Sequence, residues 1–197
     1  MTGPSISLHP ISLHPISLHP ISLHLISLHL ISREEAPTLR NLFELYAHDF
    51  SETVPLELHP NGRFEVPLSD RWWDDAEHFP FFIRENERLF GFALARRGSK
   101  ITTAADVMDV AEFFVIRGAR GKGVGAAAAH ALFEAFPGRW EIRVRHTSTL
   151  AKQFWARVAE TWAGRPIASE TFTADDVAWD VFRMDKMAPR ARVAGPP

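Results

Sequence analysis

The chain of 197 residues contains no cysteine, which excludes disulfide frameworks, thiolate metal ligands and a cysteine nucleophile, and favours a reducing, cytoplasmic setting. No apolar stretch approaches the ~20 residues that a membrane helix needs, and the N-terminus lacks the positively charged start of a secretory signal. The formal net charge is −2, so no overall basic field attracts nucleic acid or an acidic membrane. We therefore expect a soluble, cytoplasmic protein whose partner is a small molecule or a protein, with no nucleic acid or membrane partner.

The charges that are present are unevenly distributed. Residues 34 to 90 hold 13 Asp or Glu against 5 Arg, whereas residues 111 to 165 hold 9 Lys or Arg against 4 Glu. One acidic and one basic lobe would suit two different ligands. Chance variation between solvated faces accounts for the asymmetry equally well, so the motifs have to decide between these interpretations.

The N-terminus is a pentapeptide repeat, Ile-Ser-Leu-His-Pro three times and then Ile-Ser-Leu-His-Leu twice, over residues 6 to 30. A period of five fits neither a strand nor a helix, and the repeated proline removes a ladder donor. We predict a disordered tail over 1 to 20 and a first strand over 26 to 31. The repeat histidines could bind a metal loosely, but they lack the fixed constellation of a structural site. We therefore predict no metal site; a metal-handling protein, the alternative, would lose its function when 1 to 20 are deleted.

Residues 21 to 187 have the pattern of one domain, and 188 to 197 that of a flexible tail. A Ser-x-x-Glu capping box at Ser32 opens the first helix, and Pro137-Gly138 ends a later one. The predicted helices cover about 33 to 49, 72 to 75 (a short helix or lid), 126 to 136 and 148 to 163. The predicted strands cover 26 to 31, 79 to 84, 89 to 95, 107 to 116, 140 to 145, 166 to 173 and 178 to 184. This order predicts an α/β fold with a mixed, mostly antiparallel central sheet flanked by helices.

The segment 115 to 125, between a strand and a helix, has the composition of a phosphate-binding loop. Gly121, Gly123 and Gly125 let the backbone approach a ligand, and their N–H groups lie at the positive end of the helix dipole. Arg120 and Lys122 add positive charge suited to a diphosphate. A tight turn that leads into an alanine-rich helix is the simpler alternative.

Two common phosphate motifs fit this segment poorly. A P-loop is excluded, because the glycine spacing is wrong and no Ser or Thr follows Lys122. Gly121-x-Gly123-x-x-Ala126 satisfies the dinucleotide fingerprint, and Glu141 lies twenty residues beyond Gly121. However, Glu141 falls near the start of its strand, and too little chain remains for further βαβ units.

A third motif is Arg-x-x-Gly-x-Gly, formed by Arg120, Gly123 and Gly125 after a strand that contains Val115. With this motif, and with Ser148-x-x-Ala151-x-x-Phe154-Trp155 further on, residues 26 to 185 resemble the GNAT superfamily of N-acetyltransferases. Residues 109 to 115 and 136 to 141 are similar to a bacterial subgroup described only as predicted acetyltransferases. The resemblance implies a GNAT-like sheet with acetyl-CoA, the co-substrate, in a cleft between the fourth and fifth strands.

The resemblance also implies how each part of the cofactor is held. The backbone of the fourth strand would run beside the pantetheine, the glycine-loop amides would bind the pyrophosphate, and the second segment would add further contacts. The implied cofactor-binding residues are Phe113, Phe114, Val115, Arg120, Gly121, Lys122, Gly123, Val124, Gly125, Ala126, Ser148 and Phe154. The basic segment 111 to 165 would suit the CoA phosphates.

The implied reaction is direct attack of a neutral amine, on a small molecule or a peptide, on the acetyl thioester in a ternary complex. A strand-four N–H would steady the carbonyl oxygen, and the acidic segment 34 to 90 would suit a cationic acceptor. As general base we favour Glu112, with Asp109 second. Strict alternation places them on opposite faces of the strand, a bulge would change this, and pairing of each with an arginine is the alternative role.

Two positions depart from the family pattern. Ser148 stands where many members have asparagine, and Trp155 stands where a tyrosine often protonates the departing thiolate, which indole cannot do. Tyr46 is the only tyrosine, and nothing in the sequence places it at the thiol. The alternative function is therefore a catalytically weak or inactive GNAT-fold module that binds CoA.

Two further expectations concern surfaces. The aromatic residues around 72 to 82 are expected in the core more often than in an acceptor site. The exposed face of the last two strands could pair with another chain, so a homodimer is possible.

Overall fold

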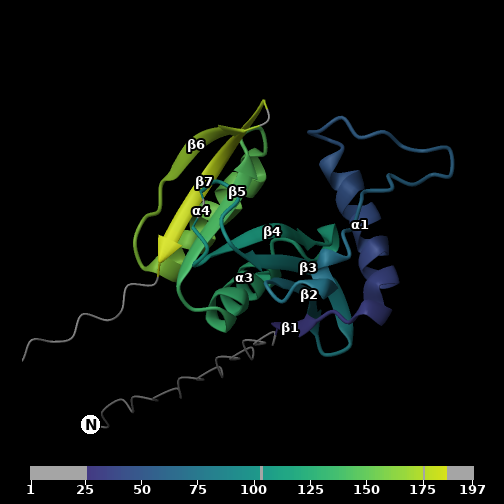
Figure 1. Cartoon of the computed structure of the whole chain (residues 1–197), viewed down its shortest axis with the longest axis horizontal. Coiled ribbons are helices and arrows are strands. Elements are labelled where there is room, and N and C mark those ends of the chain that lie inside the picture. The colour runs from purple at the N-terminus through teal and green to yellow at the C-terminus, as the bar shows by residue number, and fades with distance from the viewer. Residues whose placement is uncertain (1–25, 103, 175, 186–197) are drawn as a thin grey trace, which may run out of the picture.

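The computed structural model describes residues 26–102, 104–174 and 176–185, which form a seven-stranded sheet flanked by helices (Figure 1). The strands are β1 (Ile26–Leu30), β2 (His78–Glu85), β3 (Arg88–Arg97), β4 (Val107–Val115), β5 (Arg139–Arg145), β6 (Ser169–Ala174) and β7 (Val177–Asp185). The helices are α1 (Ala36–Phe50), α2 (Arg71–Asp74), α3 (Val124–Ala135) and α4 (Thr149–Ala163), with short 3-10 turns at Arg33–Glu35 and Arg117–Ala119. The tails predicted over 1 to 20 and 188 to 197 lie outside the described residues.

The sheet order is β1-β2-β3-β4-β5-β7-β6, and within the described chain β4 and β5 form the parallel pair while the other neighbours run antiparallel. The predicted mixed, mostly antiparallel α/β fold is therefore confirmed. Figure 1 shows β5, β7 and β6 turning away from β2, β3 and β4. The two halves of the sheet diverge at the parallel pair of β4 and β5, and the candidate functional site lies there.

Local sequence features explain where several elements begin and end. The Ser32 amide donates to the Glu35 carboxylate at 3.0 Å, as the capping-box pattern predicts, ahead of α1. Asn86 has a φ of 52° in the two-residue turn between β2 and β3, a conformation that asparagine tolerates well. Gly164, with a φ of 65°, ends α4. Each of these boundaries follows from a short sequence pattern and needs no tertiary contact to explain it.

The sheet has a hydrophobic core on each face. On one face α1 packs through Leu39 and Phe43 against Phe92 of β3, whose ring stacks on that of Phe43 at 4.7 Å. On the other face α3 and α4 pack through Leu132 and Val158. Figure 1 shows α1 and α3 on opposite sides of the strands. Because helices cover both faces, a ligand could enter the sheet only where two neighbouring strands separate.

The aromatic residues around 72 to 82 are packed in the structure, as expected. Phe82 is fully buried, Phe79 packs against Phe136, and the Trp73 indole N–H donates to the Ile31 carbonyl at 3.0 Å. Within the described chain, no helix is both long and apolar enough to traverse a bilayer.

Candidate functional site

β4 and β5 separate half-way along their length. Their parallel pairing extends from Val107, opposite Arg139, to Val110, opposite Ile142, and both strands continue beyond that point. The register between β3 and β4 shifts at the same place, which leaves Ala111 as an extra residue in β4. The backbone of β4 after Val110 therefore lacks a β5 partner and has hydrogen-bonding groups free for a ligand.

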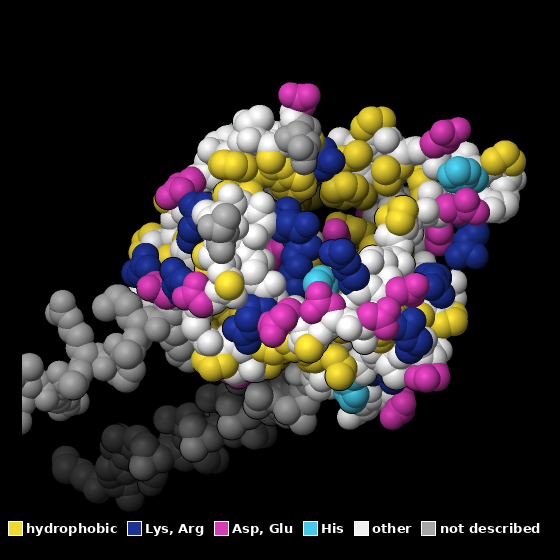
Figure 2. Space-filling view, viewed as in Figure 1, with side chains coloured by type: hydrophobic (Ala, Val, Ile, Leu, Met, Phe, Trp, Pro, Cys, Tyr) yellow, Lys and Arg dark blue, Asp and Glu magenta, His cyan; other side chains and the backbone are white. Residues whose placement is uncertain are grey.

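A cleft of about 420 Å³ lies at this separation, enclosed by α1, the loop after α1, β4, β5, the start of α4 and β7. Its apolar lining includes Phe43, Phe50, Leu56, Val66, Trp155 and Trp179. Its charged lining consists of Glu112, Arg143 and Arg145 among the residues described. Figure 2 shows a hollow with hydrophobic side chains on both walls and Lys or Arg side chains at its lower end.

The charged lining corrects one prediction. The acidic segment 34 to 90 was expected to face a cationic acceptor, yet none of its Asp or Glu residues lines the cleft. Several of these acids instead bind protein groups: Glu44 accepts from the Phe64 amide at 2.7 Å, and Asp49 pairs with two arginines. Glu44 and Asp49 thus hold the loop after α1 and the glycine loop in place, and the segment does not supply the negative charge that was expected in the cleft.

The glycine loop at the N-terminus of α3 has an open surface. Gly121 and Gly123 have φ values of 73° and 83°, and a Cβ added at either would meet no atom within 4 Å. Gly125, in the first turn of α3, lies against the Phe154 ring, which an added Cβ would approach at 3.2 Å. The exposed amides and the helix dipole fit the diphosphate of a nucleotide.

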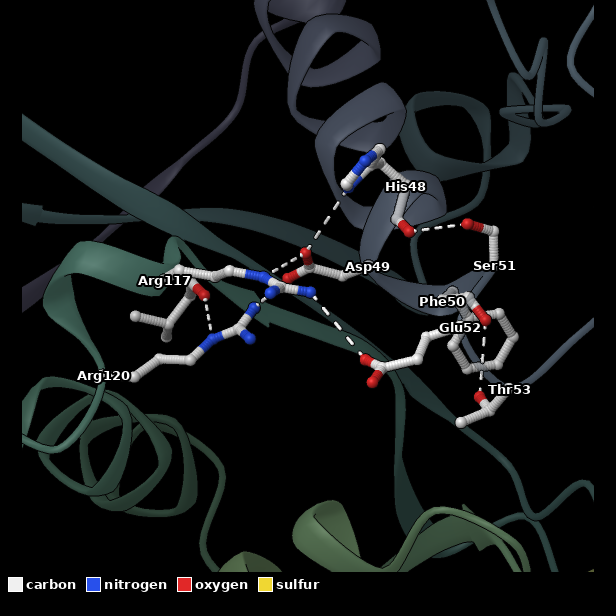
Figure 3. A network of polar contacts seen from close by, with 9 residues as sticks. His48, Asp49, Phe50, Ser51, Glu52, Thr53, Arg117 and Arg120 are labelled. Atoms are coloured by element: carbon white, nitrogen blue, oxygen red, sulfur yellow. Dashed lines mark hydrogen bonds and ion pairs between the residues drawn. The ribbon is translucent and has the colours of Figure 1, made fainter.

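The cations of this loop are bound to protein groups. Arg117 Nε donates to Asp49 at 2.7 Å, and Arg120 pairs with the same carboxylate while its Nε donates to the Val115 carbonyl (Figure 3). Lys122 donates to the Gly118 carbonyl at 2.7 Å. The positive charge predicted for a diphosphate is thus partly neutralised, and the backbone amides are the principal free donors.

Asp49, the last acid of α1, joins this helix to the glycine loop. Burial raises the pKa of its carboxyl, but hydrogen bonds from Arg117 and Arg120 outweigh burial, so the pKa is lowered overall. Figure 3 shows both guanidinium groups reaching Asp49 from the loop after β4. The C-terminal end of α1 and the loop are therefore coupled by charge.

The two carboxylates predicted as bases lie on the same face of β4. The extra residue Ala111 interrupts the alternation, so Asp109 and Glu112 both lie on the face covered by α1. Asp109 is fully buried and pairs with Arg96 and Arg143. This is the arginine pairing that the sequence left open, and it leaves Asp109 without access to a ligand.

Glu112 has a different environment. It lines the cleft and accepts a hydrogen bond from the Tyr46 hydroxyl at 2.7 Å. Burial raises the pKa of Glu112, although the bond from Tyr46 and the charge of Arg143 oppose this. Burial, and then the Glu112 charge, raises the pKa of Tyr46, so this tyrosine stays protonated. A carboxyl with a raised pKa in a cleft is suited to proton transfer near neutral pH.

Comparisons with known proteins agree with this geometry. The sequence profile of the acetyltransferase (GNAT) family matches residues 39–159, more than half of the chain. The chain belongs to the GNAT family. No curated protein sequence matches it.

Solved GNAT structures share the fold at low sequence identity. An aminoglycoside acetyltransferase, AAC(6')-Ib, in complex with coenzyme A aligns with a TM-score of 0.63 at 13% identity, over 82% of this chain and 95% of its own. An acetyltransferase from Thermus thermophilus aligns with a TM-score of 0.57 at 16% identity, over 81% and 96%. Acetyl-CoA, the co-substrate that the resemblance implied, is supported by the family and by the coenzyme A in the first of these structures.

In this GNAT chain, the start of α4 carries the second predicted segment. Ser148 precedes α4 and lines the cleft, and Phe154 faces Phe113 of β4 with ring centres 6.0 Å apart. Trp155 is buried and packs edge-on against Phe113 at 5.1 Å, so its indole has a structural role. The described cleft thus offers no acid from α4.

The sequence analysis did not assign three polar or charged residues of the cleft to the site. Tyr46 was noted only as the single tyrosine, and Arg143 and Arg145 only as part of a basic segment. Their placement at Glu112 depends on α1 and β5 meeting beside β4. Alternation along β5, which puts Arg143 and Arg145 on one face, was the one available pattern that could have grouped the two arginines.

Proposed function

We propose that this protein transfers the acetyl group of acetyl-CoA to the amine of a small molecule or peptide by direct attack in a ternary complex. The observation that carries the proposal is the free β4 backbone, which leads from Glu112 in the cleft toward the open glycine loop before α3. The family match and the coenzyme A in a solved relative support the donor. The acceptor half of the proposal rests on the geometry of Glu112.

The donor-binding residues of the proposal are those that the sequence predicted. Backbone groups of Phe113, Phe114 and Val115 would pair with the pantetheine, and amides from Gly121 to Ala126 would bind the diphosphate. Ser148 and Phe154 would lie along the same molecule. When bound, acetyl-CoA supplies an activated acetyl thioester.

Glu112 would act as the general base. It takes the proton from the acceptor nitrogen, directly or through water, as the N–C bond forms and the C–S bond breaks. Tyr46 acts as a positioning residue, because its hydroxyl holds one Glu112 oxygen and leaves the other for the acceptor. A backbone N–H of β4 beside the bulge would stabilise the carbonyl oxygen. Solvent protonates the thiolate, whose thiol pKa of about 8.5 makes it a tolerable leaving group.

Calorimetric titration of acetyl-CoA into the full chain and a Gly123→Glu variant tests the donor site. The variant places a carboxylate where the diphosphate would bind, and a juxtaposed like charge should weaken affinity by roughly 100-fold or more. Gly62→Glu is the matched control, since Gly62 also has a positive φ and open surroundings but lies in an exposed turn. Equal affinities of wild type and Gly123→Glu would contradict the donor site.

An amine panel, with release of free CoA as the readout, tests turnover. Acetylation of any amine that depends on acetyl-CoA supports the enzyme. The buried Trp155, which supplies no acid, favours the second candidate, a module that binds CoA without turnover. Tight acetyl-CoA binding with no transfer to any amine would establish that candidate.

A further inference from the structure

Arg145 is held between two aromatic rings in the wall of the cleft. Its guanidinium carbon lies 5.6 Å from the centre of the Phe50 ring of α1 and 5.3 Å from that of the Trp179 ring of β7. Such cation–π contacts restrain a guanidinium and leave its outer N–H groups available for hydrogen bonds. The side chain is thus oriented before any ligand arrives.

The charge of Arg145 is not neutralised by the residues that the structure describes. No carboxylate among them pairs with it, and its Nε is buried without a hydrogen-bond partner. The other charged groups of the cleft are satisfied, because Arg143 pairs with Asp109 and Glu112 accepts from Tyr46. A partly desolvated cation without a counter-ion is unfavourable, and a bound anion would offset that penalty.

Arg145 also lies near the reacting end of the cleft. Arg145 lines the same cleft as Glu112 and Tyr46, and its charge opposes the burial that raises the pKa of Tyr46. One acceptor could therefore present its amine to Glu112 and a second group to Arg145. A polycationic amine would instead meet like charge from Arg143 and Arg145.

We propose that the acceptor is an amine that also carries an anionic group, a carboxylate or a phosphate, bound by Arg145. The inference rests on the proposed acetyl transfer for its amine half, while the anion site stands on the geometry of Arg145 alone. Phe50, Leu56, Val66 and Trp179 give the walls an apolar character, so the part of the acceptor that faces them is apolar. Apolar α-amino acids are the simplest class that meets all three requirements.

Turnover with matched acceptors tests the preference. Leucine, phenylalanine and tryptophan are each compared with their amides, and 3-aminopropyl phosphate with 3-aminopropanol, as kcat/KM in the wild-type chain. A charge-assisted bidentate bond should favour the anionic member by about 10- to 100-fold. A preference seen with the carboxylates identifies a carboxylate as the bound anion, and a preference seen with the phosphate identifies a phosphate. Equal or better turnover of the uncharged members would overturn the proposal while leaving acetyl transfer intact.

Arg145→Gln should remove the preference by lowering kcat/KM for the anionic acceptors about 10- to 100-fold, with little change for their neutral counterparts. Arg145→Lys should retain part of it, because a point charge lacks the guanidinium fork. Arg157→Gln, on the exposed side of α4, is the matched control. Unchanged acetyl-CoA affinity shows that each variant is folded, and an Arg145→Gln variant that retains the preference contradicts the assignment.

A binding measurement separates this inference from the proposed function. N-acetylphenylalanine and its amide are titrated calorimetrically into the CoA-loaded wild type and the Arg145→Gln variant. Binding of the carboxylate that is lost in the variant supports the anion site even if no amine is acetylated, in which case acetyl transfer alone fails. Absence of carboxylate binding, or equal binding of acid and amide, rejects the anion site.

Discussion

The two ends of the proposed site, the glycine loop and the cleft, are made from different parts of the chain. At the end proposed for the donor, one contiguous stretch from Gly121 to Ala126 presents backbone amides beside the free edge of β4. At the end proposed for the acceptor, side chains come together from α1, β4, β5 and β7. Backbone recognition depends on φ values and open space, whereas side-chain recognition depends on which residue stands at each position.

This difference predicts that the two ends tolerate sequence change unequally. Solved structures that are only 13% and 16% identical to this chain keep its fold. Few side chains define a glycine loop or a strand separation, so we expect such features to tolerate sequence change. The acceptor end can change with single substitutions, so its arginines carry information about the substrate of this chain in particular.

Among variants that affect one end of the site and leave the other unchanged, Glu112→Gln is expected to have the largest effect. Losing the proposed base should lower kcat by roughly 100- to 10,000-fold, while acetyl-CoA affinity stays unchanged, because the donor end is untouched. Steady-state kinetics with calorimetry measures both quantities. Glu160→Gln, on the exposed side of α4, serves as the control. Turnover retained by Glu112→Gln would remove this residue from the mechanism.

A smaller effect is expected from Tyr46→Phe. The Tyr46 bond lowers the pKa of Glu112, so its loss should raise that pKa and shift the acidic limb of the kcat/KM profile to higher pH. At a pH above the limb, kcat should fall about tenfold because one Glu112 oxygen is no longer held. A pH profile tests this, since a purely structural role for Tyr46 would lower activity without moving the limb.

The smallest effect concerns Asp49, which joins the two ends. Its pKa is lowered in the folded protein, so its ion pairs add stability above the ordinary pKa of 3.8, and this stability is lost as the pH falls through the folded value. Asp49→Asn should reduce the free energy of unfolding by about 1 kcal/mol at pH 7. Denaturant unfolding at pH 7 and near pH 2 checks this, because the difference should vanish in acid. A difference that persists at low pH would contradict the electrostatic explanation.

Local pattern alone determined most of the fold. The β2 and β3 hairpin, the glycine that ends α4, the strand in the last copy of the repeat and the glycine loop before α3 all follow from spacing and turn chemistry over a few residues. The resemblance to GNAT proteins was carried by such short contiguous stretches, the glycine loop and the segment from Ser148 to Trp155 among them. The order of these elements then limited the sheet to a mixed topology.

Only the tertiary structure decided which side chains meet. Tyr46 and Glu112 are 66 residues apart, and Arg145 lies between rings from α1 and β7. The bulge at Ala111 put Asp109 and Glu112 on one face, and buried ion pairs then separated their roles. Local patterns depend on interactions between near neighbours, whereas the charge balance of a cleft depends on groups brought together by packing. The charge of the acidic segment therefore did not reveal which charges line the cleft, and the place of Arg143 and Arg145 beside Glu112 became evident only in the folded chain.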